Sequence, residues 1–250
     1  MTPRNILKYI LASSILFIVS SPVHSQTDVN RETDNPEKEE RVRGVQYASP
    51  EEAAEAMKKK DIPFISGMSV GGDLAGLIMA SWTAYGQYEG LFRIHLKERF
   101  FPTFEAGWGI SNHTDEETSL HYKTQAPYFR IGCDYNLNKD LHSGNRIFAG
   151  LRYAFTTFKY DLDGPDMKDP FGNGSIPYRF TGINSNSHWA EVLFGLEAKI
   201  WKSFHIGWNI RYKLRLSQKK TSLGQAWYVP GFGKNDTSTL GGSFNLIFDI

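Results

Sequence analysis

The sequence has 250 residues, with 28 basic and 27 acidic side chains, and a mean hydropathy of −0.40. The near-zero net charge excludes the basic footprint of a nucleic-acid-binding protein, so no nucleic acid is expected as a partner. The length allows one barrel or two small domains. Glycine (23 residues) and aromatic residues (14%) are enriched, which is typical of closed antiparallel sheets. The composition therefore favours an all-β protein.

Residues 1–25 have the three parts of a secretory signal peptide. Arg4 and Lys8 precede an apolar run from Ile10 to Val19, and small residues surround the end of the segment at Ser25. The run is shorter than a helix that spans a bilayer, which disfavours the alternative of a transmembrane anchor. The sequence predicts export with cleavage after Ser25.

Two short regions are expected before the first strand. Residues 26–49 are polar and charged, which predicts a disordered periplasmic leader. A short periplasmic helix is predicted over residues 50–61, with Ser49 as N-cap, Pro50 in the first turn and Lys60 near the C-terminus. Its thin apolar face favours a simple cap over a partner-binding or plugging helix.

Residues 62–250 alternate apolar and polar side chains with the period of two that indicates β-strands. In the segment Phe204–Leu216 every second residue is apolar, and the residues between are polar or glycine. Similar segments are predicted at Phe64–Leu74, Gly86–Leu96, Phe100–Ser111, Lys123–Leu137, Arg146–Lys159, Ala190–Ile200 and Thr239–Ile250.

The predicted connections alternate between short and long, as in outer-membrane barrels with periplasmic turns and extracellular loops. The long ones are Ala75–Tyr85, Asn112–Tyr122, Tyr160–Ser187 and Gln218–Ser238. The sequence thus predicts an eight-stranded antiparallel up-and-down transmembrane β-barrel with a short N-terminal periplasmic helix. No later segment offers about 18 consecutive apolar residues, so insertion must be by strands.

Alternation alone fits a soluble calyx equally well, but volume decides between the two. The interior of an eight-stranded barrel cannot hold all the bulky apolar side chains, whereas the polar face carries many glycines and balanced charges. We therefore expect the charges to face the lumen and to form an ion-pair network that seals it. The predicted network comprises Glu89, Arg93, Glu105, Arg130, Asp134, Arg152, Glu191, Glu197, Lys199, Arg211, Lys213 and Arg215.

Aromatic residues near the predicted strand ends fit the girdles found at membrane interfaces. Examples are Trp82, Tyr85, Trp108, Trp189 and Trp201, although packing in a core or loop explains some of them equally well. A further apolar segment with proline and glycine lies in the last long loop. Its residues Trp227, Tyr228, Pro230 and Phe232 are a candidate partner-docking surface, with packing over the barrel mouth as the alternative.

Four stretches carry a resemblance to a known family. They begin at His188-Trp189-Ala190-Glu191, Trp227-Tyr228-Val229-Pro230-Gly231-Phe232, Tyr128-Phe129-Arg130 and Gly150-Leu151-Arg152. In these the chain resembles an uncharacterised family of Bacteroidota outer-membrane β-barrels, catalogued as a domain of unknown function. The resemblance implies a fold and a location in the bacterial outer membrane, and it brings no activity. The basic C-terminal tail of relatives is missing after Ile250.

No convincing catalytic machinery is predicted. Ser111, His113 and Asp115 cluster in one loop, and Ser187 and His188 lie close to Glu191, yet neither group shows a recognisable signature. No cofactor or metal is expected. The lumen histidines His95 and His205 are expected to lie near each other at the periplasmic end as hydrogen-bonded core residues, with a metal or proton-sensing pair as the alternative. The aspartates Asp161, Asp163, Asp166 and Asp169 are expected to be ordinary loop residues rather than a calcium site.

We therefore expect a non-enzymatic cell-envelope protein with a sealed, charged lumen. Its expected role is that of a structural or accessory subunit, in contact with outer-membrane lipids and with other outer-membrane proteins or lipoproteins through its extracellular loops. The alternative functions are an outer-membrane enzyme acting on lipid A or phospholipids, and a narrow channel, which the crowded lumen disfavours.

Overall fold

The computed structural model describes residues 62–168, 172, 174–221 and 225–250. The predicted signal peptide, leader and short helix over 50–61 lie outside these residues. Within the described part of the chain, no helix is long and apolar enough to cross a membrane.

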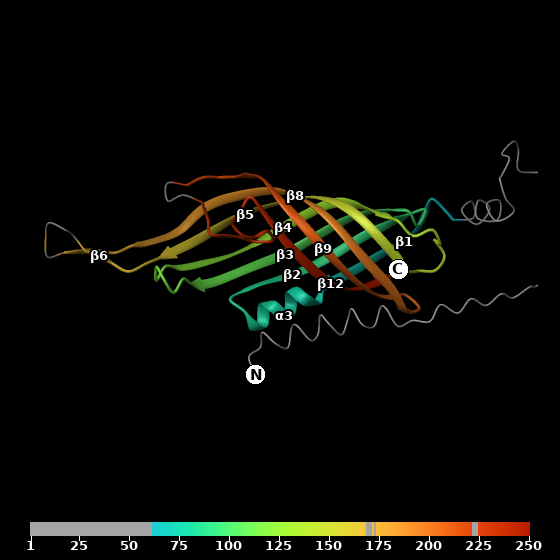
Figure 1. Cartoon of the computed structure of the whole chain (residues 1–250), viewed down its shortest axis with the longest axis horizontal. Helices are drawn as coiled ribbons and strands as arrows, with labels where there is room; N and C mark the ends of the chain where they lie inside the picture. The colour runs from blue at the N-terminus through green and yellow to red at the C-terminus, as the bar shows by residue number, and fades with distance from the viewer. Residues whose placement is uncertain (1–61, 169–171, 173, 222–224) are drawn as a thin grey trace, which may run out of the picture. The chain divides into compact units, whose positions relative to one another are not determined.

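Eight long strands form one antiparallel sheet that closes on itself as a barrel (Figure 1). Each strand pairs with the next one along the chain, and β1 closes the ring by pairing with both β2 and β12. The strands are β1 (Ile65–Asp73), β2 (Tyr85–Leu96), β3 (Phe100–Thr114), β4 (His121–Asn136), β5 (Arg146–Asp163), β8 (Arg179–Trp201), β9 (Phe204–Gln218) and β12 (Ser238–Asp249). The predicted all-β fold with eight antiparallel strands is confirmed.

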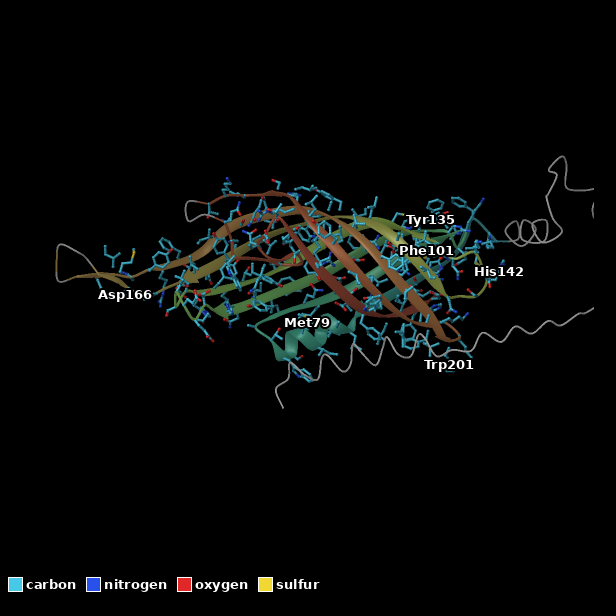
Figure 2. All side chains as sticks on the ribbon, viewed as in Figure 1. Met79, Phe101, Tyr135, His142, Asp166 and Trp201 are labelled. Carbon is cyan, nitrogen blue, oxygen red and sulfur yellow. The ribbon has the colours of Figure 1, made fainter. Side chains whose placement is uncertain are left out.

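Burial alternates along the strands, and it places polar side chains inside. On β5, Arg146 and Arg152 are buried, whereas Leu151 is 65% exposed. The same division holds elsewhere: Figure 2 labels Tyr135 and Trp201, which are 41% and 68% exposed. Charged side chains thus fill much of the interior, and large apolar side chains cover the outside.

The two ends of the barrel differ in their connections. At the end that we call the short-turn end, β2 and β3 are joined through Lys97 and Glu98, whose φ angles of 52° and 49° give the left-handed backbone of a tight hairpin. Lys202, with φ of 43°, lies in the turn between β8 and β9. The opposite, long-loop end carries the small hairpins β6–β7 and β10–β11, formed by Met167–Lys168 with Ser175–Ile176 and by Tyr228–Val229 with Gly233–Lys234.

Three of the predicted long loops contain regular structure, and the β10–β11 hairpin lies in the last of them, Gln218–Ser238. In the loop expected over Tyr160–Ser187, β5 and β8 continue as a paired hairpin, with Leu162 opposite Phe180 and Asp163 opposite Arg179. Pairing across this hairpin extends the sheet beyond the segments with strong apolar alternation. Figure 1 shows it projecting from the barrel toward β6.

The loop expected over Ala75–Tyr85 contains a helix, α3 (Leu74–Trp82). Asp73 caps it, because its carboxylate accepts from the backbone N–H groups of Ala75 and Gly76. The helix is apolar on nearly every side, and Met79 and Trp82 are 53% and 80% exposed. An aspartate N-cap before an apolar run was the sequence signal for this helix.

Candidate functional site

Arg130 is the centre of the charged interior. Its guanidinium donates to Glu89, to Glu191 at 2.8 Å and to Glu105 at 3.2 Å. Arg211 reaches the same three carboxylates from β9, with its shortest contact of 2.6 Å to Glu105. All five side chains are buried. Several opposite charges around each ion offset the desolvation that burial imposes on it.

Two further arginines extend these contacts toward the short-turn end. Arg152 joins Glu105 at 3.3 Å to Asp134 at 2.7 Å. Arg93 then joins Asp134 at 3.7 Å to Glu197 at 2.6 Å. The contacts therefore continue without a break from the middle of the barrel to Glu197.

Arg146 completes the ion-pair network at the short-turn end. Its guanidinium binds Glu197, lies 3.2 Å from Glu98 and lies 3.4 Å from Asp249. The same guanidinium lies 5.0 Å from the centre of the buried Phe101 ring, labelled in Figure 2, which adds a cation–π contact. We use "ion-pair network" for the charged side chains that these salt bridges connect, from Asp249 at the short-turn end to Glu191 in the middle of the barrel.

Glycines on the inner face provide the room that these groups occupy. A Cβ on Gly107 would overlap the ring of Tyr128, which donates from its hydroxyl to Glu89 at 2.5 Å. A Cβ on Gly150 would overlap the carboxylate of Asp134. The small residues therefore lie where large polar side chains cross the lumen.

Three members of the predicted network have no ion pair among the described residues. Lys199 is exposed near the end of β8, so the barrel does not enclose it as expected. Lys213 is buried and donates to the carbonyl oxygens of Gly231 and Phe232 at 2.8 and 3.2 Å. Arg215 donates to polar side chains of the last long loop. The other nine predicted residues form ion pairs: Glu89, Arg93, Glu105, Arg130, Asp134, Arg152, Glu191, Glu197 and Arg211.

Sequence reasoning left Arg146 and Glu98 out of the network. Arg146 lies an even number of residues before Arg152 on the same predicted strand, so both side chains face the same side. Alternation alone could therefore have assigned Arg146 to the lumen. Glu98 lies in a turn, where alternation carries no information, and only the fold brings it beside Arg146.

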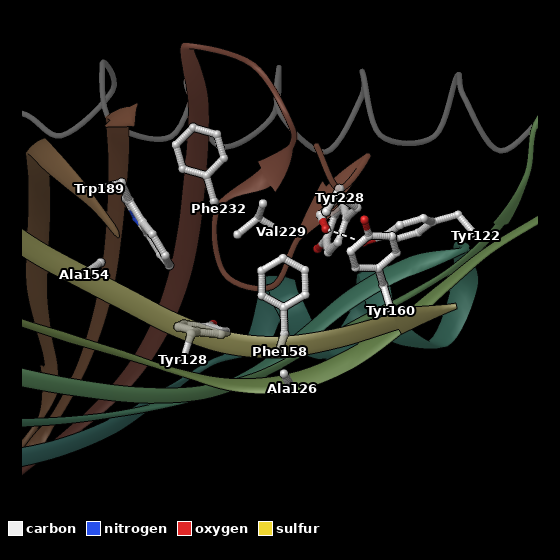
Figure 3. Packing of buried hydrophobic residues seen from close by; sticks show 11 residues of the cluster. Tyr122, Ala126, Tyr128, Ala154, Phe158, Tyr160, Trp189, Tyr228, Val229 and Phe232 are labelled. Atoms are coloured by element: carbon white, nitrogen blue, oxygen red, sulfur yellow. Dashed lines mark hydrogen bonds between the residues drawn. The ribbon is translucent and has the colours of Figure 1, made fainter. Parts of the chain in front are cut away.

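The last long loop folds into the barrel mouth. We call its described residues 225–237 the plug loop. Figure 3 shows Val229 and Phe232 of this loop among inward-facing side chains of the strands. Val229 and Phe232 are 0% and 1% exposed, and the Phe232 ring meets Trp189 edge to face at 5.7 Å. Apolar packing therefore fills the part of the long-loop half around Val229 and Phe232.

Hydrogen bonds hold the plug loop from several sides. Tyr122 donates from its hydroxyl to the carbonyl of Tyr228 at 2.7 Å, drawn as a dashed line in Figure 3. Arg130 donates to the carbonyl of Gly231 at 3.0 Å, and Lys213 shares that oxygen. Arg130 thus joins the ion-pair network to the plug loop, and Lys213 binds the same carbonyl oxygen of the loop.

The expected docking surface at Trp227, Tyr228, Pro230 and Phe232 needs correction. Tyr228, Pro230 and Phe232 are buried, so they offer no docking surface in this structure. Trp227 is half-buried and stacks on His113, with ring centres 4.7 Å apart. Packing over the barrel mouth, the stated alternative, describes these residues.

One of the aromatic residues expected in the membrane-interface girdle lies elsewhere. Trp189 is fully buried inside the barrel, where its indole nitrogen donates to Glu191 at 2.7 Å. Trp82, Trp108 and Trp201 are exposed on the outside.

Within the described residues, neither serine and histidine cluster contains a hydrogen bond between its serine and its histidine. Ser187 is buried and donates to the carbonyl of Ser217, whereas its neighbour His188 contacts Tyr153 on the outer face. Successive residues of a strand point to opposite faces, which explains the separation. His113 instead stacks on the plug loop.

Asp249 lies between the two lumen histidines. His205 is 3.0 Å and His95 is 3.9 Å from its carboxylate. Throughout the described ranges, no group of three or more His, Cys, Asp or Glu side chains is arranged to hold a metal ion. The histidines thus lie at the edge of the ion-pair network.

The loop aspartates are engaged separately. Asp161 accepts from the N–H of Gly182, and Asp163 pairs with Arg179 at 3.0 Å. Asp169 lies outside the described residues.

The fold and interior define a closed antiparallel β-barrel with an ion-paired lumen and an inward-folded plug. Residues 6–249 match the family described as a domain of unknown function, DUF6048, and the chain belongs to this family. A comparison with curated proteins finds no match.

Proposed function

We propose that the chain is an exported protein of the bacterial outer membrane, with its signal peptide cleaved after Ser25. The observation that carries the proposal is the division between the two faces of the barrel. Ion-paired charges lie inside, and large apolar side chains such as Leu151, Val192 and Leu240 are 65%, 57% and 73% exposed outside. An exposed apolar surface of this kind is stable in hydrocarbon and costly in water.

The resemblance to Bacteroidota outer-membrane barrels supports the same location. Strand number and connection pattern also agree with it, because turns are short at one end and connections long at the other. In this proposal the short-turn end faces the periplasm and the long-loop end faces outside.

The lumen is sealed in this proposal rather than conducting. The interior of an eight-stranded barrel is just wide enough for its own inward-facing side chains to fill it. The ion-pair network fills the half near the short turns, and the packed side chains of Val229, Phe232 and Trp189 obstruct the other half. Neither half supports a channel.

The role that fits such a barrel is that of a non-enzymatic structural or accessory subunit that binds other envelope proteins. Support comes from the projecting β5–β8 hairpin, whose Met167, Ile176 and Phe180 are 52%, 58% and 36% exposed. Figure 1 shows the segment at β6 projecting beyond the barrel, which this proposal places outside the lipid. No contact among the described residues favours the alternative of a lipid-modifying enzyme.

Membrane insertion is tested by expressing the full chain and extracting bacterial membranes. We expect outer-membrane fractionation, heat-dependent migration on gels and protection of the strands from protease in vesicles. Recovery as a water-soluble protein without detergent would contradict the location.

The accessory role is tested by purification in mild detergent with crosslinking and mass spectrometry. Replacing Met167 and Ile176 together by serine should abolish co-purification of an envelope protein, whereas serine at exposed Leu240 on the barrel wall should not. A chain that purifies alone under crosslinking contradicts this role.

A further inference from the structure

The barrel wall is not continuous between β2 and β12. Pairing of β1 with β2 ends at Gly72 opposite Gly90, and pairing of β1 with β12 ends at Asp73 opposite Asn245. Beyond these points, toward the long loops, each of the two strands has a strand partner on one side only. The unpaired stretch of β2 is about five residues, or roughly 15 Å of wall.

Asp73 marks the point where the wall divides. Besides capping α3, its carboxylate accepts from the backbone N–H of Phe244 on β12 at 3.1 Å and from the side chain of Gln87 on β2 at 3.3 Å. The helix then lies over the opening, so close to β2 that a Cβ on Gly86 would overlap Ala80. A helix and side chains replace strand pairing in this part of the wall.

A cavity of about 260 Å³ lies behind α3. Arg130, Arg211 and Lys213 line it on the lumen side, and the exposed Lys234 lies at its rim. None of the residues that line the cavity is acidic, so these four cations are its only charged lining residues among those described. The cavity is therefore complementary to an anion.

Lys213 has one N–H donor left that could bind such an anion. An ammonium group carries three N–H donors, and two are used on the carbonyls of Gly231 and Phe232. Both arginines, by contrast, already bind carboxylates. Among the buried cations of the described lining, Lys213 is thus the one that forms no ion pair.

The outer side of the cavity is apolar and opens toward the barrel exterior. Met79 of α3 and Leu240 of β12 belong to its lining and are 53% and 73% exposed. Gly241 and Gly242 keep the β12 side free of bulk. An occupant with one anionic end and one apolar end would match both sides of the opening.

We propose that this cavity binds the phosphate headgroup of a membrane phospholipid, with an acyl chain leaving past Met79 and Leu240 into the bilayer. The volume is near the lower end for small-molecule sites, about 300 Å³, so it admits a headgroup but not a whole lipid. The inference rests on the proposed membrane location. It names one lipid-binding position on the barrel, beside the plug loop.

Native mass spectrometry of the full chain in mild detergent tests the site, with phosphatidylglycerol as probe. Diacylglycerol of the same acyl chains and inorganic phosphate are the comparison ligands. We expect one phosphatidylglycerol per chain, held at least about tenfold more tightly than either comparison ligand. Equal affinity for diacylglycerol would overturn the phosphate contact, and equal affinity for inorganic phosphate would overturn the lipid assignment.

Two variants locate the binding. Lys213→Met removes the charge at nearly constant size, and Lys199→Met is the matched change at an exposed lysine. Gly241→Val narrows the cavity and retains the charge of Lys213, whose side chain must shift by a few tenths of an ångström because a Cβ there would lie 3.1 Å from the Lys213 Cε. We expect about a tenfold loss of affinity in Lys213→Met and in Gly241→Val, and no loss in Lys199→Met. Unchanged binding in Gly241→Val contradicts the site even if Lys213→Met fails to fold.

Heat-dependent migration and vesicle insertion are measured on the same samples. A barrel that inserts but shows no lipid preference refutes this inference and leaves the membrane proposal intact. A chain that never inserts refutes the membrane proposal itself.

Discussion

The two halves of the barrel interior are filled by different chemistry. Near the short turns, charges such as Arg93, Arg146 and Glu197 are held by the strands themselves. Near the long loops, the strands contribute aromatic residues such as Trp189, and the plug loop inserts Val229 and Phe232 between them. One half is thus closed by the wall and the other by a loop.

The difference shows how a narrow barrel avoids both a pore and an unpaired charge. Opposite charges on neighbouring strands meet in fixed register, as Arg130 and Glu105 or Arg146 and Glu197 do. A loop has no such register, so apolar packing is the simpler way for it to fill space. The halves should therefore respond differently to mutation.

The largest effect is expected from Arg130→Met. The variant leaves Glu89, Glu105 and Glu191 with one cation fewer, and breaking a buried ion pair costs about 3–5 kcal/mol. We expect a loss near 5 kcal/mol in the free energy of unfolding, measured by urea titration of the folded barrel. The matched control is Arg179→Met, because Arg179 forms an exposed pair with Asp163 and such pairs contribute about 0–1 kcal/mol. Equal losses in both variants would remove any special role of the buried network.

The next effect concerns the plug loop. Phe232→Ala leaves a void beside Trp189 and should weaken plug closure by about 3 kcal/mol, or on the order of 100-fold in the population of the open loop. The readout is the rate of thiol labelling at Val229→Cys in a Cys133→Ser background. Ile176→Ala, at an exposed position of the β7 hairpin, should leave the rate unchanged. A Phe232→Ala chain that labels no faster would show that the loop is not held by this packing.

A smaller effect concerns pH at the short-turn end. Burial raises the pKa of Glu98, but hydrogen bonds with His95 and Ser66 and the charge of Arg146 outweigh it and lower the pKa to about 2. A carboxyl with a lowered pKa stabilises the fold above its unfolded value of 4.5, and that contribution is lost as the pH falls toward about 2.

Wild type should therefore exceed Glu98→Gln in the free energy of unfolding at pH 7. The difference should shrink as the pH falls from about 5 to about 2. A difference that stays constant over this range would show that ionisation of Glu98 does not contribute.

The smallest effect is expected from Lys199→Met. Lys199 is exposed and has no ion pair within the described ranges, so the free energy of unfolding should change by less than about 0.5 kcal/mol. A loss comparable to that of Arg130→Met would place Lys199 in the network after all.

Alternation predicted the strands and the charged face because both follow from local side-chain order. Phe204–Leu216 alternates throughout, and β9 covers it. The same rule assigns Arg211 to the lumen correctly, but it fails for Lys199 at the end of β8, where the barrel no longer encloses the chain. Alternation therefore predicts which face of the sheet a side chain lies on, but not whether the barrel encloses that part of the strand.

The plug loop and α3 could not be predicted in this way. The burial of Phe232 depends on Trp189 and Tyr128, which are distant in sequence, and on glycines that leave room: a Cβ on Gly109 would lie 2.8 Å from Pro230. The apolar character of α3 suits any buried or lipid-facing helix, and only strand pairing shows that it lies over a gap in the wall.

Planar-bilayer recording tests the sealed barrel most directly. Wild type should insert and give no steady current. Phe232→Ala should also give none, because the ion-pair network closes the short-turn half without the plug loop. A steady open-state current from the wild-type barrel would contradict the account.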